Sequence, residues 1–267
     1  MSEPAPRAIM IDGEPVAPGH DAMVALDDGL VRGDGVFEGM RAYDRRVRTP
    51  DLHLDRMERS CAAIDLPFDR TRVASDLSAF LEHTSVPDCS VRAMLTRGGH
   101  LILREEPLFD LPASWALSPQ RHRPTPLLAH SKTLSYAAYM QANRAAKAAG
   151  ANEALFVDAD DDAVLEAPTS SFLWLEGDTL VAPPLERGIL DSITRRLVAE
   201  VTPLEVRDRT LAQMADADAG MLVSTVLESQ PIHEIQGVVA WEPGHRRRDE
   251  IRAALAELSR ARTADPA

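Results

Sequence analysis

The sequence predicts a mixed α/β protein with two domains. Segments with the apolar spacing of helices alternate with strand-like runs along the chain. The 267 residues exceed the ~100–200 residues of a typical domain. Residues 105–126 contain five prolines and form the best candidate for a linker. We therefore expect a small N-terminal α/β domain at 1–115, a linker at 116–126 and a larger domain at 127–267.

The first half of the chain begins with an expected hairpin at 8–16, where apolar residues flank an Asp12-Gly13 turn. A glycine-rich group and an apolar strand follow over 27–43. The pattern then predicts two helices and a strand, at 51–64, 71–82 and 90–97.

The second half is expected to continue the alternation of helices and strands. A long helix is predicted at 136–149, a helix starts near Thr194, and a charged helix spans 247–261. Short strands are expected between them, at 153–158, 163–166, 171–175, 205–207, 220–224 and 238–240.

Charge and composition exclude several classes of protein. A net charge of −13 repels phosphate backbones and anionic lipids, so neither nucleic acid nor a membrane is an expected partner. Cys61 and Cys89, the only cysteines, make neither a disulfide framework nor a zinc site. We therefore expect a reducing, cytoplasmic setting and no metal. No signal peptide or apolar run of ~18 residues is visible.

Lysine is so scarce that chemistry requiring an amine is easy to place. The chain has two lysines, and the other basic residues are arginines. Lys147 lies near the expected end of a helix, where a cation complements the helix dipole. Lys132 follows an apolar run in AHSKTLSY and is the remaining candidate for a nucleophile that forms a Schiff base.

Four further segments have both an ordinary and a functional interpretation. Glu166 lies at the end of an expected apolar strand. It is either an acid that faces solvent or the partner of a protonated pyridine nitrogen. Arg56, on a helical face with His53 and Ser60, is either solvated or a bidentate phosphate anchor. The remaining two segments, ILDSITRR (189–196) and LVSTVLES (222–229), offer a helix start and backbone or hydroxyl donors to an anion.

Together these features indicate one cofactor. An amine, a carboxylate for a ring nitrogen, and an arginine with a helix N-terminus for a phosphate are the groups that pyridoxal phosphate requires. The sequence therefore predicts a pyridoxal 5'-phosphate enzyme.

The motifs also occur in an order that resembles the class IV aminotransferases, the fold-type-IV pyridoxal phosphate enzymes. That family includes branched-chain aminotransferases, D-amino acid aminotransferases and 4-amino-4-deoxychorismate lyases. The resemblance extends from about residue 8 to about residue 240. It rests on RGDGVFEGMRAYD, HLDRMERS, KTLSY, EALFVD, LEAPTSSF, ILDSITR and STVLESQPI.

This resemblance implies two α/β domains with the cofactor in the cleft between them, and a homodimer. It implies that Lys132 binds the cofactor covalently and moves the substrate proton. The other cofactor-binding residues that it implies are Arg56, Tyr136, Glu166, Ser192, Ile193, Thr194 and Thr225. The substrate-binding positions that it implies are Phe37, Arg41 and Val226.

The sequence departs from the family pattern at three places. Ser192 replaces the usual glycine before the phosphate-binding amides, and Ser171 replaces an asparagine after the glutamate. A tyrosine that helps to hold the substrate carboxylate in branched-chain enzymes would fall near Ser90 and is absent. The carboxylate could therefore be held by a different residue: Arg92, Arg97, His100 or Arg104.

The expected reaction is reversible transamination of branched-chain or other apolar amino acids with a keto acid. Glu38, which follows Phe37, is typical of the branched-chain group. The spacing of KTLSY instead resembles the lyases and the D-amino acid aminotransferases. Aminodeoxychorismate lyase and D-amino acid aminotransferase therefore remain alternatives, and a non-enzymatic cofactor binder is a more distant one.

Overall fold

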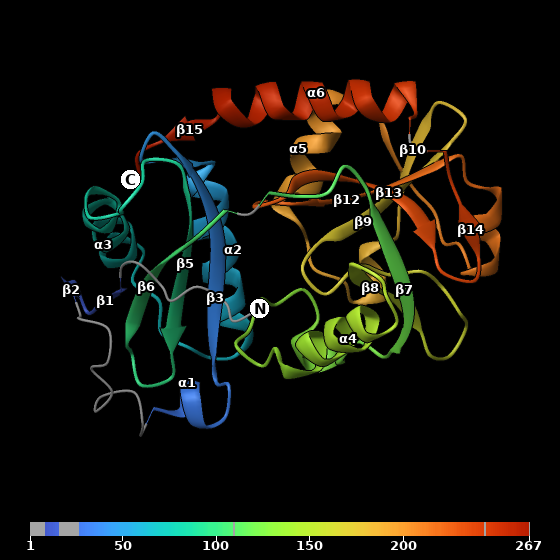
Figure 1. The fold of residues 1–267 in the computed structure, drawn as a ribbon. Coiled ribbons are helices and arrows are strands. Elements are labelled where there is room, and N and C mark those ends of the chain that lie inside the picture. The colour runs from blue at the N-terminus through green and yellow to red at the C-terminus, as the bar shows by residue number, and fades with distance from the viewer. Residues whose placement is uncertain (1–8, 16–26, 109, 243, 267) are drawn as a thin grey trace. The chain divides into compact units, whose positions relative to one another are not determined.

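The computed structural model describes residues 9–15, 27–108, 110–242 and 244–266 (Figure 1). The chain divides into two compact units. Unit 1 comprises residues 1–109, 131–136 and 259–267, and unit 2 comprises residues 110–130 and 137–258. This mixture of helices with two sheets is the mixed α/β class that the sequence predicts.

Unit 1 contains a seven-stranded sheet in the order β15-β4-β3-β5-β6-β1-β2. Its strands are β1 (Ile9–Ile11), β2 (Glu14–Pro15), β3 (Gly35–Tyr43), β4 (Arg46–Arg48), β5 (Cys89–Thr96), β6 (Leu101–Glu106) and β15 (Thr263–Ala264). Its helices are α1 (Asp28–Val31), α2 (Pro50–Ala63) and α3 (Arg70–Glu82). The expected hairpin, both helices and both longer strands of this half are therefore confirmed.

Alternation along β3 decides which residues of unit 1 form the core. Val36 and Met40 are fully buried and belong to one cluster with Leu54 and Met57 of α2. Successive strand side chains alternate, so Glu38 shares the face of Val36 and Met40, and Phe37 and Gly39 point to the opposite face. Unit 1 thus has a core face covered by α2 and α3 (Figure 1). The second face of its sheet carries Phe37.

Unit 2 contains an eight-stranded arrangement in the order β11-β10-β9-β12-β13-β7-β8, with β14 on β13. The strands are β7 (Trp115–His122), β8 (Glu153–Asp158), β9 (Ser171–Glu176), β10 (Thr179–Ala182), β11 (Leu204–Val206), β12 (Ala219–Ser224), β13 (Glu228–Ile235) and β14 (Val239–Ala240). Three 3₁₀ turns, η1 (Pro126–Leu128), η2 (Leu185–Arg187) and η3 (Ala212–Asp216), connect them.

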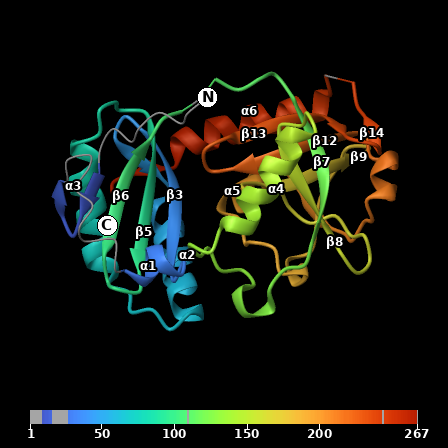
Figure 2. The same ribbon diagram turned by 60° about the horizontal axis from the view of Figure 1, so that its bottom comes forward.

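The helices of unit 2 are α4 (Ala137–Ala148), α5 (Ile193–Val201) and α6 (Arg246–Ala261), of which the last three residues belong to unit 1. Helix α4 packs on β7 and β8 (Figure 2). Leu197 of α5 and Leu255 of α6 join a cluster with Leu173 of β9. A separate cluster holds Trp174, whose ring stacks on Phe172 with centroids 5.9 Å apart.

Strand β7 occupies most of the segment 116–126, where the sequence predicts a linker. Strand β7 pairs with β13 only at Trp115–Leu117, and Pro119 lies beyond that pairing. A proline lacks the backbone N–H and is tolerated where no ladder bond is needed on one side. The compact units divide at 109/110 instead of at 115/116.

Two other segments differ from the predicted elements. Residues 163–166 do not form a regular strand, because Ala163 and Val164 make only isolated bridges, to Thr210 and Val157. The charged C-terminal helix is followed by β15, in which Thr263 pairs with Arg48.

No helix within the described ranges is both long and apolar enough to cross a membrane.

Gly220 is expected to tolerate no larger side chain. A Cβ at this position would lie 2.7 Å from Cζ3 of Trp241 and 3.3 Å from Cε2 of Phe172. Overpacking of this kind costs about 1–3 kcal/mol. Gly220→Ala should therefore lower the free energy of unfolding by that amount in a denaturant titration.

Gly244→Ala provides the control, because a Cβ there meets no described atom within 4 Å. Equal stability of the two variants would contradict the packing around Gly220.

Candidate active site

Lys132 lies on a short segment that runs along β3 within unit 1. The Lys132 carbonyl accepts a hydrogen bond from the Phe37 amide at 2.9 Å, and the Leu134 amide donates to the Gly35 carbonyl at 2.9 Å. The Lys132 amide donates to Oγ of Ser60 on α2 at 3.1 Å. These bonds fix the backbone of Lys132 to a strand and a helix of the same unit.

Two aromatic rings surround the Lys132 amine. Its Nζ lies 4.3 Å from the ring centre of Phe37 and 5.8 Å from that of Tyr136. The two rings meet edge to face with centroids 5.3 Å apart. Cζ of Arg92 lies 4.8 Å from the same Phe37 ring. The structure therefore brings together three of the residues predicted from the sequence and one of the candidate carboxylate ligands.

Arg56 of α2 is paired with a buried carboxylate. Its Nε and Nη2 donate to the two oxygens of Glu38 at 2.7 Å each. Nδ1 of His53 lies 2.7 Å from Oε2 of Glu38. Because Glu38 is ionised and can only accept, Nδ1 of His53 carries the proton.

The charge state of this cluster follows from its surroundings. Burial would raise the pKa of Glu38, but the Arg56 guanidinium and the hydrogen bonds from Arg56 and His53 lower that pKa to about 2. Burial also lowers the pKa of His53. Glu38 is therefore a permanent carboxylate near neutral pH and cannot donate a proton. Glu38 therefore has a structural role, in which it joins β3 to α2.

The second face of the unit 1 sheet carries a row of cations. Gly39 pairs with Arg92 in register, and Arg92 pairs with Arg104. A Cβ built at Gly39 would meet no described atom within 4 Å, so there is open space above this glycine. Gly39 lies beside Arg92 only because β3 pairs with β5. Its place in the motif gives no sign of this neighbour.

The candidate carboxylate ligands have different partners in the structure. Nε of Arg92 donates to Glu106 at 2.7 Å, and Arg104 is 4.0 Å from the same carboxylate. Arg97 donates to Asp34 at 3.0 Å and to the carbonyls of residues 64 and 65. Arg41 lies over the ring of Tyr43, 4.9 Å from its centre.

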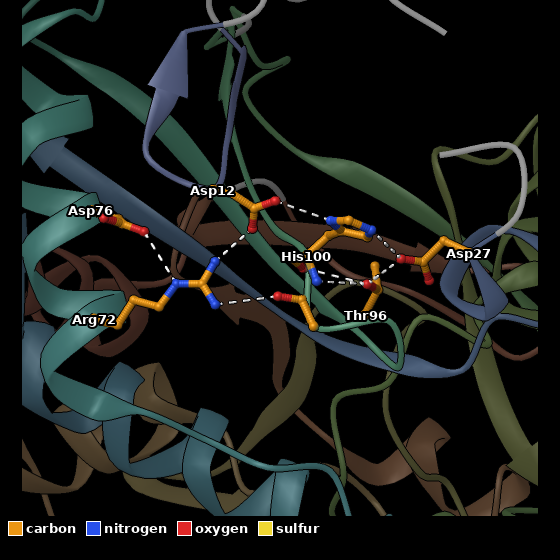
Figure 3. A network of polar contacts seen from close by, with 7 residues as sticks. Asp12, Asp27, Arg72, Asp76, Thr96 and His100 are labelled. Carbon is orange, nitrogen blue, oxygen red and sulfur yellow. Dashed lines mark hydrogen bonds and ion pairs between the residues drawn. The ribbon is translucent and has the colours of Figure 1, made fainter. Parts of the chain in front are cut away.

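His100 belongs to a polar network with Asp12, Asp27, Thr96 and Arg72 (Figure 3). Its Nδ1 lies 3.1 Å from Asp12 and its Nε2 lies 3.6 Å from Asp27. Asp27 also accepts from Oγ1 of Thr96, and Arg72 pairs with Asp12. A ring that already faces two carboxylates is poorly suited to bind a third.

Glu166 lies in unit 2, where it is bonded to the segment that leads into α5. Its carboxylate accepts from the Leu190 amide at 3.2 and 3.3 Å, and only 8% of the residue is exposed. The bonds from Leu190 hold Glu166 to the segment just before α5. Burial, with a smaller Coulombic effect of Glu166, raises the pKa of Tyr139 to about 12.

Ser192 is the N-cap of α5. It has extended backbone angles, and its Oγ accepts from the Arg195 amide at 3.2 Å. The serine in place of the family's glycine thus supplies a capping oxygen. Ile193 and Thr194 are buried in the first turn, where backbone N–H groups have no acceptor inside the helix. Such a helix start attracts anions.

Thr225 and Val226 lie in the turn between β12 and β13. Thr225 is 8% exposed, and the Leu227 amide closes the turn by donating to Oγ of Ser224 at 3.2 Å. Six of the predicted residues, from Glu166 to Val226, therefore belong to unit 2. The other predicted residues, which are Lys132, Phe37, Arg41, Arg56, Arg97 and Tyr136, belong to unit 1.

Removing the Glu38 charge should destabilise the protein. Glu38→Gln leaves the Arg56 guanidinium buried without a counter-charge, which costs about 3–5 kcal/mol. The folded pKa of Glu38 lies below its ordinary value of 4.5, so its contribution is complete above that value. It is lost as the pH falls toward about 2. Unfolding titrations from pH 2 to 7 should show the difference between the variant and the wild type shrinking with acid.

Glu106→Gln removes a partly exposed carboxylate from the same sheet and should cost about 0–1 kcal/mol. A Glu38→Gln protein as stable as the wild type at pH 7 would refute the importance of this ion pair.

Comparison of the sequence with known proteins identifies a family. Residues 35–235 match the family described as Amino-transferase class IV. The chain is 31% identical over 245 residues to a "Putative branched-chain-amino-acid aminotransferase" of Methanocaldococcus jannaschii, covering 82% of this chain and 85% of that protein. It is 29% identical over 264 residues to a "Bifunctional aminodeoxychorismate lyase / D-amino acid transaminase" of Mycobacterium tuberculosis, covering 86% of this chain and 91% of that protein.

The fold has a counterpart among solved structures. A structure titled "A hypothetical aminotransferase from Mycobacterium tuberculosis, PLP-bound form" matches with a TM-score of 0.84 and 25% identity. The match covers 95% of this chain and 99% of the other. The protein described here belongs to the class IV aminotransferase family.

Proposed function

We propose that this chain is a pyridoxal phosphate-dependent aminotransferase that exchanges an amino group between an apolar, branched-chain amino acid and a keto acid. The placement of Lys132 is the observation that carries this proposal. One of only two lysines in the sequence is bonded through its backbone to β3 and α2. Its amine lies against the rings of Phe37 and Tyr136.

The donor groups of the two units fit this cofactor in chemical type. Unit 1 supplies an amine on Lys132, and unit 2 supplies a buried carboxylate on Glu166 and a serine-capped helix start at α5. Glu166 would hold the ring nitrogen. The amides of Ile193 and Thr194, with Thr225, would hold the phosphate. When bound, the cofactor supplies an electron sink for the substrate's α-carbon.

The chain's own residues would handle the proton and exclude water. The Lys132 amine would take the proton from the α-carbon and return it. The rings of Phe37 and Tyr136 lie against that amine and would limit the access of water to it. Arg56 uses Nε and Nη2 for Glu38, so these two nitrogens are already bonded within unit 1.

Arg92 is the best-placed residue to hold the substrate carboxylate. Arg92 and Lys132 both contact the Phe37 ring. Arg92 also pairs across the strands with Gly39, above which the space is open. Arg92 and Arg97 are each paired with a carboxylate, Glu106 and Asp34, but Arg97 also donates to two backbone carbonyls. An arginine can bind a carboxylate with two parallel hydrogen bonds.

Aminodeoxychorismate lyase activity is the second candidate, with D-amino acid transamination beside it. Lys132 and Tyr136 are separated by three residues, a spacing that resembles those two groups. A relative of 29% identity carries both activities in its name.

We also propose a homodimer that works in the reducing cytoplasm. Support for a dimer comes from the family and from apolar side chains that are exposed in the single chain, such as Leu30 and Leu127. Support for the compartment comes from two buried free thiols, Cys61 and Cys89.

Half-reactions of the purified protein test the activity. Pyridoxal phosphate should bind to Lys132, and borohydride reduction with peptide mapping should find the label there and not on Lys147. A branched-chain amino acid should then convert the bound aldehyde to the pyridoxamine form, and a keto acid should restore it. Lys132→Ala should abolish the label and the conversion.

If no amino acid of either configuration converts the cofactor, while aminodeoxychorismate yields pyruvate, the chain is a lyase. The conversion of D-amino acids only would indicate the D-amino acid alternative.

Arg92→Gln should weaken catalysis through substrate binding. Loss of a charged hydrogen bond costs about 1.5–3 kcal/mol, so kcat/KM for the amino acid should fall roughly 10- to 100-fold at that scale. Arg97→Gln is the comparison, since its partners are within unit 1. Kinetic assays with both variants check this, and a larger loss for Arg97→Gln than for Arg92→Gln would reverse the assignment.

A further inference from the structure

The loop that carries Glu166 is bonded to β8 at its first residue. The Phe156 amide donates to the Glu166 carbonyl at 2.9 Å, and the Leu165 amide donates to the Phe156 carbonyl at 2.9 Å. Together with the bonds from Leu190 to the Glu166 carboxylate, these contacts fix the backbone and the side chain of Glu166 at one end of the loop.

The far end of the loop is bonded to a second residue of β8. Oε1 of Glu153 accepts from the Thr169 amide at 3.0 Å and from Oγ1 of Thr169 at 2.6 Å. Glu153 is only 2% exposed, whereas Thr169 lies at the surface. A buried carboxyl group thus reaches outward and binds an exposed threonine by both its backbone and its side chain.

A closed turn connects the two ends. The Ala167 amide donates to the Ser170 carbonyl at 2.8 Å, and the Ser170 amide donates back to the Ala167 carbonyl at 3.3 Å. These two bonds hold residues 167–170 in one conformation. A bond that fixes Thr169 therefore also restricts the position of Glu166, which directly precedes Ala167. Glu153 and Phe156, three residues apart on one strand, therefore bracket residues 166–169.

We propose that Glu153 is a positioning residue, which fixes the orientation of Glu166 by bonding Thr169 at the opposite end of the turn. This role rests on the proposed function, in which Glu166 holds the ring nitrogen of pyridoxal phosphate. Nothing in the motif around Glu153 requires an acid for packing, since its neighbours on β8 are apolar and buried.

The surroundings of Glu153 favour its neutral form. Oε2 is buried and has no hydrogen-bond partner among the described residues. Burial raises the pKa of Glu153, against the opposing effects of the Thr169 bonds, Asn143 and Lys147. The oxygen that accepts both bonds is present in a neutral amide as well. Glutamine should therefore replace Glu153 without loss of the contact.

Three variants and a control test this role in the full-length protein. Glu153→Ala removes the acceptor, Glu153→Gln keeps it, and Thr169→Val removes one of the two donors at an exposed position. Thr125→Val is the matched control, because Thr125 is also exposed and its side chain makes no capping bond in unit 2. Hydrogen exchange of residues 167–170 is measured without the cofactor, and pyridoxal phosphate binding is measured by titration.

Glu153→Ala should speed hydrogen exchange in 167–170 and shift the absorbance of the bound cofactor. It should also raise the dissociation constant of pyridoxal phosphate by up to about tenfold, the upper scale of a lost neutral hydrogen bond. Thr169→Val should shift both quantities in the same direction by less. Glu153→Gln and Thr125→Val should stay close to the wild type.

Normal cofactor affinity and absorbance in Glu153→Ala would overturn this role alone, even if thermal stability fell, because Glu153 would then be merely structural. Failure of the wild-type chain to bind pyridoxal phosphate would overturn the proposed function, and this role with it. The two failures are therefore distinguishable.

Discussion

The buried ion pair between Glu38 and Arg56 is the constraint around which unit 1 is arranged. It joins β3 to α2 with two hydrogen bonds of 2.7 Å, and His53 adds a third. Two charges removed from water are tolerated only when each satisfies the other. The strand and the helix are therefore fixed to each other at this point.

The position of Lys132 depends on that junction. Phe37 precedes Glu38 on β3 and points to the opposite face of the strand, where its ring meets the lysine amine. Ser60 is one turn beyond Arg56 on α2 and accepts the Lys132 amide. The ion pair thus fixes the strand and the helix that hold the segment of Lys132.

Unit 2 uses hydrogen bonds where unit 1 uses charge. The Glu166 carboxylate is bonded to the Leu190 amide, and the next residues of the chain lead into the serine-capped start of α5. An acid and a helix N-terminus are therefore positioned by one short segment. The backbone amide of Leu190 thus sets the direction of the carboxylate.

The sequence by itself determined the order and type of most elements, the scarcity of lysine and the sequence of motifs that indicate the family. These signals are local: a helix face formed by His53, Arg56 and Ser60 is visible in a spacing of three and four residues. The substrate and the roles of individual site residues stay predictions. Only the tertiary structure decided that Arg56 pairs with Glu38, that Arg92 and not Arg97 shares the Phe37 ring with Lys132, and that Pro119 lies within a strand. Such contacts depend on which strands pair and in what register, and side chains distant in the sequence meet only when the sheet has formed.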